Sequence, residues 1–374
     1  MSRNVARRPV LMISQVPPPY HGSTVMSQRL FDMLADLNQS PVLVDRRFSQ
    51  NVEDVGRFSI AKLLAVPSLL WRLGQAIFRY RPGLSILFLT NRPGSFLIDF
   101  AMTGLLRATR TPIILYLHTG GYKTLSLRGR PWRWLLSATF RRADTVVTLS
   151  PRLVDDISDW TKPAQVEVIP NYTPPIDESE SVNAVRDSDS IHILFLGNLI
   201  PEKGAHEVAA VTRLLALEEF NVRVTICGAP TEDAYYQRLL EEASLLENLA
   251  VIPGLYGDEK NELILSSDLL LYPSRYPLEA QPLVILECLS AGVPVVSYDV
   301  GGIADILAFG GGILIEDNAG DGTTRLAAAI TALVSSPGTL DRMAAAARET
   351  YERHYSYAAF RDRWKSILAS PRRS

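Results

Sequence analysis

The sequence predicts an α/β protein of two doubly wound, Rossmann-like domains facing a central cleft, and three observations support this fold class. First, 374 residues are more than one ordinary core contains. Second, apolar, β-branched runs alternate with helical stretches, which is typical of parallel sheets. Third, both halves open with a strand, a Gly/Pro loop and a helix, in VLMISQVPPPYHGS and IHILFLGNLIPEKG. Ligands of such sheets bind beyond the carboxyl ends of the strands.

Each half is expected to contribute six strands, with helices in much of the space between them. In the first half the strands are expected at Pro9–Val16, Pro41–Arg46, Leu84–Asn91, Pro112–His118, Thr145–Leu149 and Val166–Pro170. In the second half they are expected at Ile191–Gly197, Val222–Cys227, Ala250–Ile252, Leu269–Tyr272, Val293–Tyr298 and Gly312–Ile315. The stretch 173–190 is rich in Pro, Ser, Asp and Glu and is the natural linker. The domains are therefore expected at 1–172 and 191–350.

Composition indicates an ordinary globular protein, with 47% hydrophobic and 21% charged residues. Cys227 and Cys288 each lie in an apolar segment, which indicates buried, inert thiols in a reducing compartment. No Cys/His pair has the spacing of metal ligands. The apolar run Val10–Ile13 is short for a signal peptide and indicates a strand. No segment reaches the ~18 apolar residues of a membrane span, so a soluble, cytoplasmic protein is expected.

Charge is distributed unevenly between the two halves. Residues 1–170 hold 22 Lys/Arg and 11 Asp/Glu, a net charge of +11, and residues 171–374 hold 16 and 29, a net charge of −13. A basic half indicates that one face meets an anionic partner. Nucleic acid is not the expected partner, because no motif pairs basic residues with aromatic residues for base stacking.

Two segments of the basic half mix Leu, Trp and Phe with basic residues, at 61–83 and 128–142. Helices of this composition can lie in a membrane interface, with Trp71, Trp132 and Trp134 as the residues that would insert. The alternative is that they pack on the sheet and extend their arginines into water. The net charge favours an anionic membrane surface, so a peripheral position on the inner face of the cell membrane is an option.

The stretch EAQPLVILE places Glu279 and Glu287 around an otherwise apolar run, although a buried charge is costly unless it is paired. Pro282 suits the first turn of a helix and Gly292 its end, so the helix is expected near 282–291. The free N–H groups around Pro282 and Leu283 favour phosphate. A ribose, with two adjacent hydroxyl groups, would match Glu287. On spacing alone, Glu287 could also be a solvated glutamate on an exposed helix face.

The segment SRYPLEAQPLVILECLSAGVPVVSYDVGG (274–302) resembles the glutamate–seven–glutamate signature of family 4 glycosyltransferases, which have the GT-B fold. The resemblance continues in PPPYHG (17–22), LHTGGY (117–122), VIPN (168–171), LFLGNLIPEKG (194–204) and the tail YSYAAFRDRWKSIL. These matches span nearly the whole chain in the expected order. The resemblance implies an acceptor-side domain at 1–172, a donor-side domain at 191–350, and a C-terminal helix in 351–374 that returns to the first domain.

The resemblance also implies site residues. Lys203 would bind the donor diphosphate, Glu287 the nucleotide ribose, and Glu279 would face the transferred sugar and position it. His118 would contact that sugar from the first domain, beside Glu279 and Lys203 as the third catalytic residue. The implied donor-binding residues are Gly22, Asn198, Lys203, Pro282, Leu283 and Glu287. At Gly22, the missing Cβ would let backbone amides approach phosphate closely.

One position departs from the family pattern. Asn198 stands five residues before Lys203, where the family usually has an arginine. An asparagine can donate a hydrogen bond but carries no charge, so one diphosphate contact is weakened or supplied by another side chain. Arg275 is a candidate for that substitution.

The resemblance implies a retaining hexosyltransferase that uses a nucleoside-diphosphate sugar and needs no cofactor and no divalent metal. A lipid-linked or growing saccharide of bacterial envelope or exopolysaccharide synthesis is the expected acceptor, because of the charge and the amphipathic segments. Two alternatives stay open. One is another sugar-nucleotide enzyme on this fold, such as an epimerase. The other is a catalytically weak scaffold protein that binds a nucleotide sugar, an alternative that Asn198 keeps open.

Overall fold

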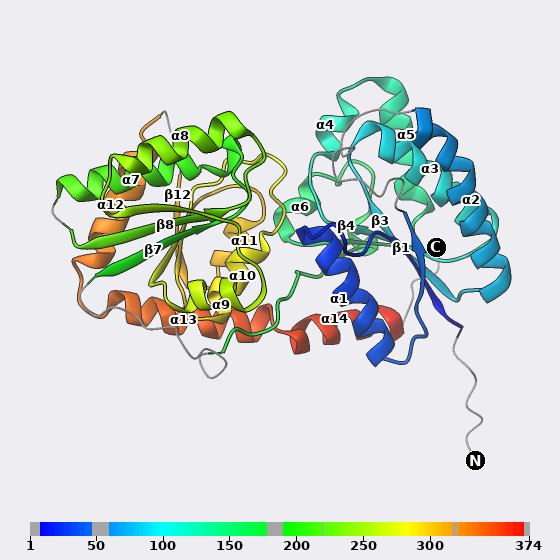
Figure 1. Cartoon of the computed structure of the whole chain (residues 1–374). Coiled ribbons are helices and arrows are strands. Elements are labelled where there is room, and N and C mark those ends of the chain that lie inside the picture. The colour runs from blue at the N-terminus through cyan, green and yellow to red at the C-terminus, as the bar shows by residue number, and fades with distance from the viewer. Residues whose placement is uncertain (1–7, 47–59, 178–189, 219, 317–319, 370–374) are drawn as a thin grey trace, which may run out of the picture. The chain divides into compact units, whose positions relative to one another are not determined.

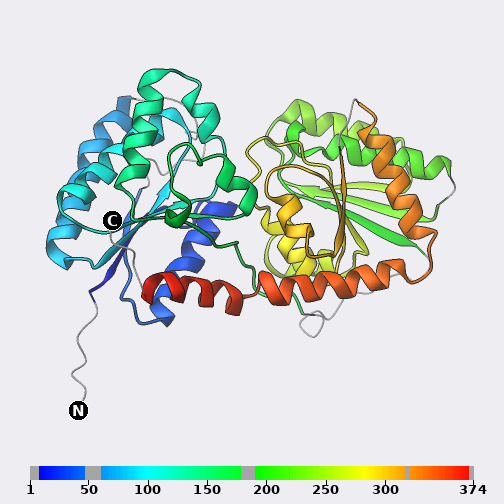
Figure 2. The ribbon, with the colours of Figure 1, turned by 180° about the vertical axis from the view of Figure 1, so that it is seen from behind.

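The computed structural model describes residues 8–46, 60–177, 190–218, 220–316 and 320–369, with backbone only for 60–65. Its contacts divide the chain into two compact units. Unit 1 consists of Met1–Pro170 and Arg361–Ser374, and unit 2 consists of Asn171–Phe360. Each unit is built on one parallel six-stranded sheet, as Figures 1 and 2 show. The predicted class of two doubly wound α/β domains is confirmed.

Unit 1 alternates strands and helices along the chain. Its strands are β1 (Val10–Ser14), β2 (Val42–Asp45), β3 (Leu84–Leu89), β4 (Ile113–Leu117), β5 (Thr145–Thr148) and β6 (Val166–Val168). Its helices are α1 (Gly22–Asp36), α2 (Ile60–Tyr80), α3 (Pro93–Ala108), α4 (Tyr122–Ser126), α5 (Arg130–Arg142), α6 (Pro151–Asp155) and the 3-10 helix η2 (Pro163–Gln165). All six strands lie where the apolar runs predict them.

The strand order of unit 1 is β2-β1-β3-β4-β5-β6. The chain steps from β1 to β2 in one direction and then crosses back past β1 to β3. Since such crossovers are right-handed, α1 lies on one face of the sheet and α2, α3 and α5 lie side by side on the other (Figure 1). The C-terminal part of α14 (Tyr357–Ala369) covers the face of α1, where Trp364 packs edge-on against Tyr116 of β4 with ring centroids 5.3 Å apart.

The second unit repeats this alternation. Its strands are β7 (Ile191–Leu196), β8 (Val222–Gly228), β9 (Leu249–Pro253), β10 (Leu269–Tyr272), β11 (Val295–Tyr298) and β12 (Gly312–Ile315). Its helices are η4 (Pro201–Lys203), α7 (Ala205–Leu217), α8 (Asp233–Ser244), α9 (Gly257–Leu265), α10 (Leu283–Ser290), α11 (Ile303–Leu307), α12 (Gly322–Val334) and α13 (Thr339–His354). The first residues of α14 also belong to this unit.

The strand order of unit 2 is β12-β11-β10-β7-β8-β9. The chain runs outward from β7 to β9, then returns to the other side of β7 and runs outward again. The order therefore reverses between β7 and β10. In open parallel sheets, ligands bind outside the carboxyl ends of the strands at such a switch point. The corresponding point of unit 1 lies between β1 and β3.

Several predicted boundaries need correction. Residues 173–177 are not linker, because Thr173 and Ile176 are buried in unit 2, and 178–189 lie outside the described residues. The C-terminal helix of the segment 351–374 reaches unit 1 but does not begin at residue 351. Instead α13 ends at His354, and α14 begins after Ser356, whose hydroxyl accepts a hydrogen bond from the Ala359 N–H at 3.4 Å. Only residues from 361 onward belong to unit 1.

Candidate active site

The loop between β7 and α7 ends in the short helix η4, whose last residue is Lys203. Gly204 follows in a left-handed conformation, with φ of 81°. A Cβ at this position would lie 2.3 Å from the carbonyl oxygen of Pro273. Only glycine allows both the conformation and this close approach, so the loop lies directly against the segment that follows β10. Lys203 is thereby held at the switch point of the second sheet.

Glu279, in the loop between β10 and α10, is buried and forms an ion pair with Lys203. The Lys203 Nζ also donates to the Tyr272 hydroxyl at 2.8 Å. The hydroxyls of Tyr272 and Ser274 donate to the Glu279 carboxylate at 3.2 and 3.0 Å. Burial raises the pKa of Tyr272, and the negative charge of Glu279 raises it further, so this hydroxyl stays a donor. All three contacts are made by one oxygen of the buried carboxylate, Oε2.

The backbone of Glu279 is fixed by the turn VGG (300–302) after β11. From the sequence alone, this stretch is only a Gly-rich turn before a helix. Gly301 has φ of 54°, and a Cβ there would lie 1.8 Å from the Glu279 carbonyl oxygen. The Gly302 N–H points to the same oxygen at 3.4 Å. A side chain at Gly301 would push the loop of Glu279 away, so the turn positions the carboxylate.

Glu287 lies on α10 and is 9% exposed. Its carboxylate forms an ion pair with Lys260 of α9, with 2.7 Å between Nζ and Oε1. The alternative of a solvated glutamate on an exposed helix face is therefore wrong. The sequence does not single out Lys260, because this residue stands among Asp and Glu in GDEKNEL, which has the composition of an ordinary solvated helix. The feature that could have indicated Lys260 is a positive charge on the helix that precedes β10.

Helix α10, which follows Glu279 and contains Glu287, begins one residue later than predicted. Pro282 is the N-cap of α10, with an extended ψ of 124°, and no side chain caps the helix. The N–H groups of its first turn, beginning at Leu283, are therefore open to a ligand. Gly292 ends the helix with φ of 72°, as predicted.

Asn198 lies exposed in the same loop as Lys203. Arg275, the candidate to replace the missing arginine, is engaged elsewhere in unit 2. Its guanidinium forms an ion pair with Glu207, whose carboxylate is buried, and lies 4.3 Å from the centre of the Tyr298 ring. This arrangement gives Arg275 a structural role, so the expected substitution is not supported by its contacts.

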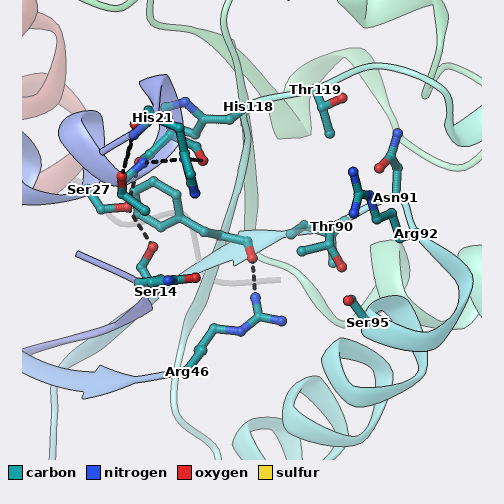
Figure 3. Close-up of a pocket in the computed structure, with 15 residues that line it drawn as sticks. Ser14, His21, Ser27, Arg46, Thr90, Asn91, Arg92, Ser95, His118 and Thr119 are labelled. Carbon is teal, nitrogen blue, oxygen red and sulfur yellow. Dashed lines mark hydrogen bonds between the residues drawn. The ribbon is translucent and has the colours of Figure 1, made fainter. Parts of the chain in front are cut away.

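Unit 1 contains a cavity of about 300 Å³ at its own switch point. The side chains in Figure 3 come from the carboxyl ends of β1, β2, β3 and β4 and from the first turns of α1 and α3. Most of its polar lining consists of hydroxyl, amide, imidazole and guanidinium groups, among them Ser14, Ser27, Arg46, Asn91, Arg92 and His118. Such groups suit a ligand rich in hydroxyl groups.

His118 follows β4 and lines this cavity (Figure 3). Its ring stacks on Phe88 at 4.9 Å and meets Tyr116 edge-on at 4.2 Å, measured between ring centroids. Its Nε2 is buried and has no hydrogen-bond partner within the part of the chain that the structure describes. Burial lowers the pKa of His118 to about 3, so the ring is neutral and can donate or accept one hydrogen bond to a ligand.

The side of the cavity opposite His118 is formed by Arg46, which the sequence analysis did not single out (Figure 3). Its guanidinium donates to the Phe88 carbonyl at 2.6 Å and pairs with the buried Asp99. Burial raises the pKa of Asp99, and the charge of Arg46 opposes that shift.

Gly22 is the exposed first residue of α1, so its N–H is one of the free amides of that helix.

The structure brings Lys203 and Glu279 into contact and places Glu287 with Lys260, whereas His118 and Gly22 belong to unit 1. Within the described ranges, no group of three or more His, Cys, Asp or Glu side chains could hold a metal ion. Both cysteines are free and buried.

Two family models match the chain in adjoining segments. The model of group 1 glycosyl transferases matches residues 177–350, and that of glycosyltransferase family 4 matches residues 34–175. Glycogen synthase of Mycobacterium tuberculosis is 29% identical over 223 residues, which are 58% of this chain and 50% of that protein. The chain thus spans about half the length of this curated relative.

Two solved structures share the fold over nearly the whole chain. Sucrose-phosphate synthase from Thermosynechococcus elongatus aligns with a TM-score of 0.75 at 16% identity, over 97% of this chain and 99% of that chain. Anabaena Alr3699/HepE in complex with UDP-glucose aligns with a TM-score of 0.71 at 16% identity, over 96% and 99%. With the two sheets and the spacing of Glu279 and Glu287, these matches show a glycosyltransferase with the GT-B fold, similar in its first half to glycosyltransferase family 4 and in its second half to the group 1 glycosyl transferases.

Proposed function

We propose that this glycosyltransferase moves a hexose, with retention of configuration, from a nucleoside-diphosphate sugar to a saccharide acceptor. The observation that carries the proposal is the pair of buried carboxylates in unit 2, Glu279 and Glu287, each in an ion pair with a lysine. A ligand that carries both phosphate and hydroxyl groups offers Lys203 and both carboxylates new partners. The pair of Lys203 and Glu279 can then open without leaving a buried charge uncompensated.

The donor site follows from these contacts. Lys203 turns from Glu279 to the diphosphate, which it binds as a point charge. Glu279 then accepts hydrogen bonds from the transferred sugar, and Glu287 accepts them from the ribose hydroxyls while it stays paired with Lys260. Asn198 and the open N–H groups of the first turn of α10, beginning at Leu283, add neutral donors for the phosphates.

Electrostatic stabilisation of the leaving group supplies the catalysis. When the bond between the anomeric carbon and the diphosphate breaks, its electron pair stays on the diphosphate. Lys203 and the amides of α10 meet this charge as it forms, which lowers the barrier more than it tightens ground-state binding. No divalent metal is needed in this scheme. Activity abolished by EDTA and restored by manganese would refute that part of the proposal.

We assign the acceptor to the cavity of unit 1, with His118 beside the transferred sugar and Gly22 close to phosphate. The hydroxyl, amide and guanidinium lining supports a saccharide acceptor. A lipid-linked or growing saccharide of bacterial envelope or exopolysaccharide synthesis is the acceptor that the basic charge of this unit favours. The site of action is then the cytoplasmic side of the cell membrane.

A thermal-shift panel of nucleoside diphosphates, followed by turnover of the matching sugar nucleotides, tests the proposal. A ligand at about 100 times its dissociation constant raises the free energy of unfolding by about 2.7 kcal/mol. One base should stand out, and its sugar nucleotide should be consumed faster with a saccharide acceptor. Donor isomerised without an acceptor would instead indicate an epimerase. Binding with no turnover under any condition would indicate a scaffold protein.

A further inference from the structure

Helices α2, α3 and α5 form one continuous face of unit 1 (Figure 1). From residue 60 to residue 143 the sequence contains 13 Lys/Arg and a single acidic residue, Asp99. That residue is fully buried and paired with Arg46, so it contributes no negative charge to the face. The outer surface of these three helices therefore carries positive charge without compensating carboxylates of its own.

The same face exposes large apolar side chains. Trp71 and Phe78 of α2 are 69% and 81% exposed, and Trp134 of α5 is 58% exposed. Trp71 and Phe78 are seven residues apart, which places them on the same side of the helix two turns apart. Leu97 of α3 is also exposed. Large exposed apolar groups gathered on one face indicate an interaction surface.

An apolar groove joins two of these helices. Its cavity of about 580 Å³ lies between α2 and α3 and has no charged lining residue in the described part of the chain. Its walls are formed by Pro67, Leu70, Trp71, Phe78, Ala101 and Leu105, with Gly74 and Gln75 completing the lining. The groove is thus continuous with the exposed aromatic side chains.

Exposed arginines surround this apolar centre. Arg72 and Arg79 follow the two aromatic residues directly on α2, and Arg107 lies in the last turn of α3. Arg133 lies beside Trp134 on α5, and Arg141 lies in its last turn. Apolar side chains with arginines beside them are the pattern of helices that lie in a membrane interface, where the arginines reach lipid phosphates.

One of the three tryptophans expected to insert does not belong to this face. Trp132 is half-buried and packs against the core residue Phe96, with ring centroids 6.5 Å apart. Trp71 and Trp134 remain, and the structure adds Phe78 and Leu97. Nucleic acid would engage the arginines but would leave the apolar groove without a function, so a lipid surface accounts for more of this face.

We propose that the face formed by α2, α3 and α5 binds the surface of an anionic lipid bilayer. Trp71, Phe78, Leu97 and Trp134 insert among the headgroups, and the surrounding arginines bind lipid phosphates. No described helix is both long and apolar enough to cross a membrane, and this attachment needs none that does. The inference does not depend on the transfer reaction, because none of these residues belongs to the candidate active site.

Vesicle sedimentation tests the proposal with the full chain. Vesicles of phosphatidylglycerol mixed with phosphatidylcholine are compared with vesicles of phosphatidylcholine alone. Salt is varied from about 0.01 M to about 1 M, which shortens the Debye length from ~30 Å to ~3 Å. The protein should bind the anionic vesicles at low salt at least tenfold more tightly than the neutral ones, and high salt should weaken this binding.

Paired variants separate the contribution of the apolar side chains to vesicle binding from that of the arginines. Trp71→Ser with Phe78→Ser, and separately Arg72→Gln with Arg79→Gln, should each weaken binding about tenfold or more. Matched controls in unit 2 are Leu217→Ser with Leu245→Ser, and Arg213→Gln, all at exposed positions, and they should bind as the wild type does. Transfer to a water-soluble acceptor should be unchanged in every variant, so loss of the transferase function would be recognised separately.

Three results would overturn the proposal. The wild-type protein could stay in the supernatant with anionic vesicles at low salt. The controls could lose as much binding as the face variants. Finally, only the arginine variants could lose binding while a soluble polyanion competes fully, which would show that the face serves a nucleic acid or an acidic protein instead.

Discussion

The two units differ in net charge and in whether their charged side chains are buried and paired. Unit 1 carries 27 basic and 12 acidic residues, a net charge of +15, and unit 2 carries 11 and 28, a net charge of −17. In unit 2 the charges at the candidate site are buried and paired, as in Lys203 with Glu279 and Lys260 with Glu287. On the outer helices of unit 1, most arginines are exposed, and Asp99, the one acidic residue of these helices, is buried and paired with Arg46.

This difference indicates two kinds of recognition. A buried ion pair gains little net stability, but it leaves a costly unpaired charge if one partner is removed. Any ligand of unit 2 must therefore replace a partner, which demands a defined arrangement of phosphates and hydroxyls. Exposed arginines demand only a negative surface, since water and salt already screen them. Unit 2 is thus suited to one specific ligand, and unit 1 combines a polar cavity with a surface of low specificity.

The largest effect should follow from Glu279→Gln, which keeps the shape of the side chain and removes its charge. If Glu279 acts on the reacting sugar, kcat should fall by on the order of 10²- to 10³-fold, the range seen when one preorganised polar group is lost from an active site. The Michaelis constant for the donor should change much less. Steady-state kinetics over both substrates measure this, with the exposed Glu241→Gln on α8 as the control.

A change confined to the Michaelis constant for the donor would show that Glu279 only binds substrate. Thermal unfolding of the variant is needed beside the kinetics, because the substitution also leaves Lys203 without its carboxylate. An unfolding temperature equal to that of the wild type would exclude a loss of folded protein as the cause.

Removing the Lys203 side chain should weaken binding of the donor's phosphates and leave binding of its nucleoside unchanged. Lys203→Met alone would leave Glu279 buried without a cation, so the informative variant is Lys203→Met with Glu279→Gln, compared with Glu279→Gln alone. A charged hydrogen bond contributes about 1.5–3 kcal/mol, so the nucleoside diphosphate should bind about 10- to 100-fold more weakly. The nucleoside should bind equally to both variants in calorimetry. Equal losses for the two ligands would show that Lys203 does not contact phosphate.

Much of unit 2 could be predicted from the sequence because its site interrupts the pattern of the core. A carboxylate in an apolar run, such as Glu287 within PLVILECL, is an anomaly that requires a partner. The partner itself could not be predicted, because Lys260 is brought to Glu287 by the packing of α9 beside α10 and not by local sequence. The same holds for Gly301, whose contact with the Glu279 backbone joins two loops far apart in the chain.

Less of the candidate site in unit 1 could be predicted from the sequence, for a related reason. Its strands follow from their apolar runs, but its cavity is lined by common polar residues at strand ends, such as Ser14, Thr90 and Asn91. None of these is unusual in its own segment, and only the strand order brings them together. The basic face showed in the composition, whereas the distinction between Trp71, which is exposed, and Trp132, which packs inward, required the helix packing.

Glu287→Gln should have a smaller effect than the removal of Lys203, and it should weaken binding of the nucleoside as well as that of the nucleoside diphosphate. If Glu287 binds the ribose, the nucleoside and the nucleoside diphosphate should both bind about tenfold more weakly, as expected for a charged hydrogen bond of about 1.5 kcal/mol. The value of kcat should change little, because the ribose contact exists before and during the reaction.

A 2′,3′-dideoxynucleotide sharpens this test. It should bind the wild type and Glu287→Gln with nearly equal affinity, because both hydroxyls from which the carboxylate accepts are missing in both complexes. A full tenfold loss that persists with the dideoxy ligand would place Glu287 away from the ribose hydroxyls. Lys260→Met should weaken nucleoside binding in the same direction, since it removes the cation that pairs with Glu287 and leaves that buried carboxylate without its partner.

The smallest effect near neutral pH concerns His118 of unit 1, a half-buried side chain whose Nε2 is buried. Its pKa is about 3 in the folded protein, against an ordinary value of 6.5. Between these two pH values the unfolded chain holds a proton that the folded chain does not, so acidification favours unfolding. The wild type should therefore lose stability relative to His118→Gln as the pH falls below 6.5, by up to about 1.4 kcal/mol per pH unit. Denaturant unfolding at several pH values measures the difference between the two proteins, in which the carboxylates common to both cancel. A difference that stays constant from pH 7.5 to about 4 would mean that the imidazole is hydrated in the free protein, and the cavity would then not hold His118 ready as a neutral partner for a sugar.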